Sequence, residues 1–139
     1  MSLGEHGGDP PGTICVLSGD VHHAYVAQAR WTDASVRTPI FQLTCSPIHN
    51  YVPRPMQVVF KIAWSRAAEK TTRFMHSRVS QVPKMVVDWT REAGPYWGNE
   101  IATLHLDGRG ARMELERTKR SDGRHPDHLH PVTELTLAR

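Results

Sequence analysis

The sequence predicts an α+β chain: short strands come first, one long helix follows at about 56–79, and a β-hairpin comes next. Two observations carry this prediction. Short apolar runs rich in β-branched residues and bounded by Ser, Gly or Pro are typical of strands. Between Met56 and Val79 the apolar spacing changes to that of a helix with one apolar face. A chain of 139 residues is long enough for one domain with a hydrophobic core.

Three strands are expected before the helix, at 13–17, about 23–31 and 39–45. In the second, residues 23, 25, 27 and 29 would lie on one face and residues 24, 26, 28 and 30 on the other. A turn at Thr32-Asp33-Ala34-Ser35 follows it. Ser46-Pro47 ends the third strand, because proline has no backbone donor and restricts the residue before it.

The expected helix is strongly basic. Pro53 and Pro55 mark its entry, and Pro83 follows its end. Residues 54–91 hold eight Lys or Arg against two acids, whereas the whole chain carries +3. Such a run is usually a solvated helix face. It could also steer anionic substrates or bind nucleic acid, but no aromatic platform accompanies it, and we expect no specific nucleic-acid partner.

A strand at 84–91 and a hairpin with arms at 100–106 and 111–118 are expected after the helix. Asp107-Gly108 between the two arms is a strong turn signal. We divide the chain into a flexible linker at 1–12, a main domain at 13–118, and a polar tail at 119–139. Within the tail, residues 132–137 are a candidate edge strand.

Neither a secretion signal nor a membrane-spanning segment is visible in the linker, which is rich in Gly and Pro. The location is therefore unknown: we take the cytoplasm as the default, and export if a longer precursor carries a signal. Cys15 and Cys45 each lie in an apolar run and are expected to be buried thiols, with no disulfide required.

The residues that carry chemistry are Ser18-Gly19-Asp20-Val21-His22-His23, directly after the first strand. A carboxylate at Asp20 and an imidazole at His22 suit divalent or trivalent metal ions. Two other interpretations stay open. One is a turn whose polar residues only face water, and the other is a small β-rich metal protein that uses His22 and His23.

Three stretches resemble, in order, the C-terminal part of the PhoD-like alkaline phosphatase (phosphodiesterase) family. The segment 12–26 is similar to the last metal-binding motif, 41–50 to the next strand and loop, and 94–108 to the C-terminal hairpin. The resemblance implies a calcineurin-like metallophosphoesterase fold, a β-sandwich flanked by helices, with a multinuclear metal site that hydrolyses phosphate esters.

Carried over by residue, the resemblance makes Asp20 and His22 metal ligands in the family's Gly-Asp-x-His motif. His23 is a weaker candidate for a place beside the metal or facing the phosphate, on the catalytic side. Asn50 is a weak candidate for a metal ligand and His49 for a donor to a phosphate oxygen. The metal is expected to be Ca, Fe, Mn or Zn.

The family's earlier metal motifs do not precede Gly12. We therefore expect a C-terminal segment of a phosphoric ester hydrolase that is inactive alone, with a phosphate ester as substrate only in the intact enzyme. It should need the missing N-terminal part or self-association for stability. The alternatives are a non-catalytic basic anion-binding module and a decayed gene remnant. A second histidine cluster at His125, His128 and His130 is expected to bind metal only adventitiously.

Overall fold

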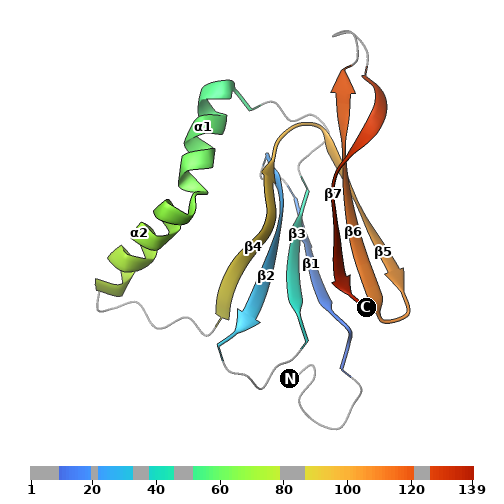
Figure 1. Cartoon of the computed structure of the whole chain (residues 1–139), viewed down its shortest axis with the longest axis horizontal. Helices are drawn as coiled ribbons and strands as arrows, with labels where there is room; N and C mark the ends of the chain where they lie inside the picture. Colours follow the sequence, from blue (N-terminus) through green and yellow to red (C-terminus); the bar gives the residue numbers. More distant parts are fainter. Residues whose placement is uncertain (1–9, 20–21, 33–37, 46–51, 79–86, 121–125) are drawn as a thin grey trace. The chain divides into compact units, whose positions relative to one another are not determined.

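The computed structural model describes residues 10–19, 22–32, 38–45, 52–78, 87–120 and 126–139. The chain divides into two compact units. One comprises Met1–Tyr51 with Val86–Arg139, and the other comprises Val52–Met85. The first unit is built of strands and the second of helices (Figure 1).

Sheet A of the first unit contains β1 (Ile14–Ser18), β2 (Ala24–Trp31), β3 (Ile40–Thr44) and β4 (Val87–Tyr96). Their spatial order is β1-β3-β2-β4. β1 runs parallel to β3, whereas β2 is antiparallel to both β3 and β4. The first and third strands of the sequence are therefore neighbours, and β1 and β4 form the lateral edges of the sheet.

Sheet B is an antiparallel meander of β5 (Glu100–Asp107), β6 (Gly110–Arg120) and β7 (Pro126–Ala138). The turn between β5 and β6 contains Gly108 at a φ of +55°, a backbone region that glycine adopts without a steric penalty. Asp107 pairs with Gly110 across this turn, so the hairpin has the position and register that the Asp-Gly signal predicts.

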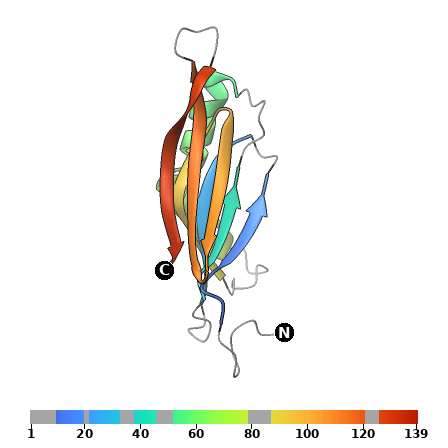
Figure 2. The same ribbon diagram turned by 90° about the vertical axis from the view of Figure 1, so that its right-hand side faces the viewer.

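The two sheets lie face to face (Figure 2), and buried side chains from both form one hydrophobic core among the described residues. Alternate residues of β6 point into it, because successive side chains of a strand face opposite sides. Met113 and Leu115 are its largest fully buried apolar side chains, together with Val26 of β2. The core residues are Ala24, Val26, Phe41 and Leu43 from sheet A and Ala111, Met113, Leu115 and Leu137 from sheet B.

The second unit contains α1 (Arg54–Ala63) and α2 (Arg66–Arg78). Pro55 stands in the first turn of α1, where its missing N–H costs no helical hydrogen bond. The Ser65 hydroxyl accepts a 3.2 Å hydrogen bond from the backbone N–H of Ala68, a bond typical of the residue that caps a helix N-terminus. Within the described ranges, no helix has the length and apolarity needed to cross a membrane.

The prediction of a helix-flanked α+β fold with one long helix at 56–79 is wrong. The described residues are mostly β, in two sheets, and those of the predicted helix form two separate helices. The helix breaks at Trp64 and Ser65, where the Ser65 side chain starts a new helix instead of continuing the first. Pro126–Ala138, which fall in the predicted polar tail, form β7 and add a third strand to sheet B.

Candidate functional site

Parallel pairing of β1 and β3 brings two loops to one end of sheet A. Ser18 is in register with Thr44, so both strands finish at the same end and their following loops start side by side. In the sequence, the segments after these two strands carry the five predicted site residues Asp20, His22, His23, His49 and Asn50. We call this end, formed by Ser18, Gly19, Thr44 and Cys45, the motif end.

Hydrogen bonds hold the motif end together. The hydroxyls of Ser18 and Thr44 are 2.6 Å apart, and the backbone N–H of Cys45 donates to the Ser18 carbonyl over 3.2 Å. Thr44 is only 1% exposed, whereas Ser18 faces solvent. The two loop starts are therefore fixed to each other by both backbone and side-chain contacts.

His22 has an unusual backbone. Its φ is +57°, in the left-handed region, and its side chain is exposed. Few residues other than glycine adopt this region, although His, Asn and Asp do so more often than most. The left-handed residue turns the chain between β1 and β2, so the segment is not extended there. Backbone conformations of this kind cluster at functional sites.

His23, the next residue, is half-buried and belongs to a row of aromatic rings. Its imidazole stacks on Tyr25 with ring centroids 5.4 Å apart, and Tyr25 and Trp89 form a T-shaped pair with centroids 6.1 Å apart. Tyr25 lies on β2 and Trp89 on β4. This packing anchors the C-terminal end of the loop to sheet A.

β4 approaches the start of β2 closely. Gly94 has a φ of +97°, and a Cβ there would lie 2.8 Å from the Ala24 carbonyl oxygen and 2.9 Å from the Cβ of Tyr25. Such distances leave no room for a side chain. Glycine at this position therefore allows β4 to pack against β2 at Ala24 and Tyr25, directly after His23.

Of the predicted site residues, Asp20, His49 and Asn50 lie outside the described residues. His22 and His23 are the two that the structure describes. No group of three or more His, Cys, Asp or Glu that could hold a metal is found in the part of the chain that is described. His128 and His130 are exposed on β7, and His125 lies outside the description.

Glu100 is a buried acid that sequence reasoning missed. It is 2% exposed at the start of β5, and its backbone carbonyl accepts a 3.6 Å hydrogen bond from the Cys45 thiol. This contact connects the motif end to sheet B. Nothing in the local pattern around Glu100 marks it as buried, because the contact is made with a residue 55 positions away.

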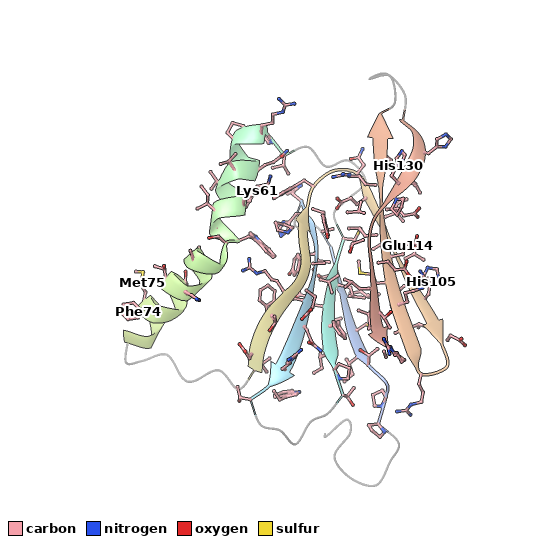
Figure 3. All side chains as sticks on the ribbon, in the orientation of Figure 1. Lys61, Phe74, Met75, His105, Glu114 and His130 are labelled. Atoms are coloured by element: carbon pink, nitrogen blue, oxygen red, sulfur yellow. The ribbon has the colours of Figure 1, made fainter. Side chains whose placement is uncertain are left out.

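The outer face of sheet B carries a network of polar and charged side chains, also unforeseen; Figure 3 labels two of its members, His105 and Glu114. Glu114 lies 3.4 Å from His105 and 3.5 Å from Arg112, and Arg112 also lies 3.0 Å from Glu134. The hairpin signal could have revealed part of it, because the Asp-Gly turn places His105 opposite Arg112. Partly exposed pairs of this kind contribute little to stability.

Both thiols are reduced and have raised pKa values. Burial raises the pKa of Cys15, and a hydrogen bond from the Thr13 side chain partly offsets this. Burial likewise raises the pKa of Cys45. A backbone hydrogen bond at Ala102 lowers it, and the charge of Glu100 raises it further. Neither cysteine has the lowered pKa that marks a reactive thiolate.

Comparison of the chain with protein-family models, with curated proteins and with solved structures finds no match.

Proposed function

We propose that this chain supplies the Gly-Asp-x-His loop of a metal-dependent phosphoesterase. The observation that carries the proposal is the parallel pairing of β1 and β3, with Ser18 in register with Thr44. Ligands usually bind at the carboxyl ends of strands that run parallel in a sheet. The loop with Asp20 and His22 and the loop with His49 and Asn50 both leave this end.

The residue types at the motif end suit the proposed ion. A carboxylate at Asp20 and an imidazole at His22 are ligands for hard or borderline cations, and the amide oxygen of Asn50 would add a third. The exposed side chain and left-handed backbone of His22 also support the proposal. A metal held by these residues would supply the chemistry of such an enzyme: it would polarise phosphoryl oxygens and activate a water molecule.

The chain's own residues then have distinct tasks. Asp20 and His22 would hold the ion, and His49 would donate a hydrogen bond to a phosphate oxygen. His23 fixes the end of the loop through its stack on Tyr25. Structural zinc sites use four protein ligands and catalytic sites about three, so this loop needs further ligands for tight binding.

Metal titration of the full chain tests the proposal. Binding of Mn²⁺, monitored by the loss of the free-ion EPR signal, should be weak. Either Asp20→Ala or His22→Ala should abolish this binding. A matched control is the double variant His128→Ala/His130→Ala, which should keep it. Mn²⁺ binding that is unchanged in both Asp20→Ala and His22→Ala would contradict the proposal. Dependence on His22 and His23 but not Asp20 would favour the small metal protein instead.

Hydrolysis of bis-p-nitrophenyl phosphate in Mn²⁺, Zn²⁺, Ca²⁺ or Fe³⁺ provides a second test. We expect this chain alone to give no turnover above the metal blank. Turnover lost in Asp20→Ala would mean that the chain already carries a complete site.

A titration with labelled oligonucleotide separates this proposal from an anion-binding module. Weak binding without sequence preference is expected. Submicromolar affinity at physiological salt that weakens steeply as salt is raised, and is lost when Lys61, Lys70 and Arg73 become Ala, would favour the binding module.

A further inference from the structure

The lateral edge of sheet A at β1 is unusual for an edge strand. Residues Ile14–Ser18 contain no charged residue and no proline, and their pairing with β3 continues without a bulge. Val16 is 51% exposed and Leu17 is 67% exposed. Parallel strands with apolar sequences normally lie inside a sheet, covered on both sides. Among the described residues, β1 pairs with β3 alone.

The other lateral edges of the two sheets carry features that discourage further strand pairing. Charges, prolines and register shifts are the usual means by which proteins protect edges. β4 and β7 each show register shifts in their pairing, and β5 carries charge. Examples are Asp88 and Glu92 in β4, Asp107 in β5, and Pro131 and Glu134 in β7. β1 differs from all three.

Backbone hydrogen bonds fix which groups of β1 face outward. Ile14 donates its N–H to Pro39, and Ser18 accepts at its carbonyl from Cys45, both on the side of β3. Backbone groups alternate in direction along a strand. The N–H and C=O groups of Cys15 and Leu17 therefore point to the open side, where a further strand would meet them.

We propose that β1 is the dimerisation edge of this protein and pairs antiparallel with β1 of a second copy about a two-fold axis at Val16. In this register Cys15 of each copy exchanges both backbone hydrogen bonds with the partner's Leu17, and the two Val16 side chains lie opposite each other. The neutral edge permits this, because no like charges meet. A two-fold contact also closes, so pairing stops at two copies.

An antiparallel arrangement of the two β1 strands is more favourable than a parallel one. Antiparallel ladders are slightly more stable per residue, and a parallel head-to-tail contact would leave a new edge open. A five-residue edge makes a small interface, so the dimer should depend on concentration. The result would be one sheet continuous across both copies.

Light scattering after size exclusion, over about a hundredfold range of concentration, should show monomer converting to dimer. Val16→Lys and Val16→Glu should each weaken dimerisation at least about tenfold, because two like charges then face each other at the axis. Mixing the two variants should restore a dimer. Leu106→Lys, at a 70% exposed position of β5, is the charge-matched control and should dimerise like the wild type.

Disulfide trapping keeps the test informative if a charged variant fails to fold. Directly opposite residues of a non-hydrogen-bonded antiparallel pair have Cα atoms about 4.5 Å apart, within the range that a disulfide spans. In a Cys15→Ala/Cys45→Ala background, Val16→Cys should form a disulfide-linked dimer under mild oxidation, and Leu106→Cys should not. The proposal is overturned by a wild type that stays monomeric, by assemblies larger than two, or by equal trapping of both variants.

Discussion

The hydroxyls of Ser18 and Thr44 lie 2.6 Å apart, one at the end of β1 and the other at the end of the parallel strand β3. The two residues differ in burial: Ser18 is exposed and Thr44 is buried. It is the side-chain contact that ties together the strand ends from which both candidate site loops leave.

Removing both partners of this pair should cost less than the sum of the costs of removing each one alone. Ser18→Ala deprives the buried Thr44 hydroxyl of this partner, and we expect it to lower the free energy of unfolding by about 1 kcal/mol. Ser18→Ala/Thr44→Val replaces both groups with apolar ones and should cost less than the sum of the single changes. Urea unfolding followed by circular dichroism measures the four proteins of this cycle. Additive effects would mean that the two hydroxyls are not coupled.

Leu115 tests the common core of the two sheets. It is 1% exposed and lies with Met113 among residues of both sheets. Leu115→Ala should lower the free energy of unfolding by about 2–5 kcal/mol, because it removes buried methyl groups and leaves a cavity. The matched control Leu106→Ala, at the exposed end of β5, should change it by less than about 0.5 kcal/mol. Similar losses for both variants would contradict the shared core.

Gly94→Ala tests the close approach of β4 to β2. The new Cβ would lie 2.8 Å from the Ala24 carbonyl oxygen, and alanine disfavours a φ of +97°. We expect a loss of about 1–3 kcal/mol in the free energy of unfolding. Gly108→Ala is a useful comparison, since it has positive φ but no atom within 4 Å of the added Cβ, and should cost less. Equal losses would show that backbone strain alone matters at Gly94.

Local signals predicted the parts of the fold that local residues determine. The turn between β5 and β6 is specified by Asp107 and Gly108, which are adjacent in sequence. The register of the hairpin could therefore be predicted from the sequence. The helix break could not, because apolar residues continue at helical spacing past Ser65. A serine inside a helix and a serine capping a new one look alike in sequence.

The other features that the sequence did not predict depend on strand pairing between residues far apart in the chain. The segment 126–138 contains two prolines and three histidine or aspartate positions, so the sequence suggests a polar tail with an edge strand only at 132–137, whereas β6 pairs with all of Pro126–Ala138 as β7. The candidate site depends on the same kind of contact. Periodicity predicted strands before both loops, but only the order β1-β3-β2-β4 brings those loops to one end of the sheet.

The two thiols should make stability fall at alkaline pH. Burial raises the pKa of both Cys15 and Cys45 above the ordinary value of 9.0, so the folded thiols keep their protons to higher pH than the unfolded ones. Below this value both states are protonated and the thiols add no pH dependence. As pH rises past 9.0, the unfolded state loses protons first and is favoured.

A cysteine-free variant, Cys15→Ala/Cys45→Ala, isolates this effect from other groups that titrate at alkaline pH. The difference in unfolding free energy between wild type and variant should be constant up to about pH 8 and should then shift against the wild type. Glu100→Gln should reduce the shift only in part, because burial, rather than the charge of Glu100, is the largest cause at Cys45. A difference that stays constant through pH 10, or one that moves in favour of the wild type, would show that the folded thiols are not shielded from solvent in this way.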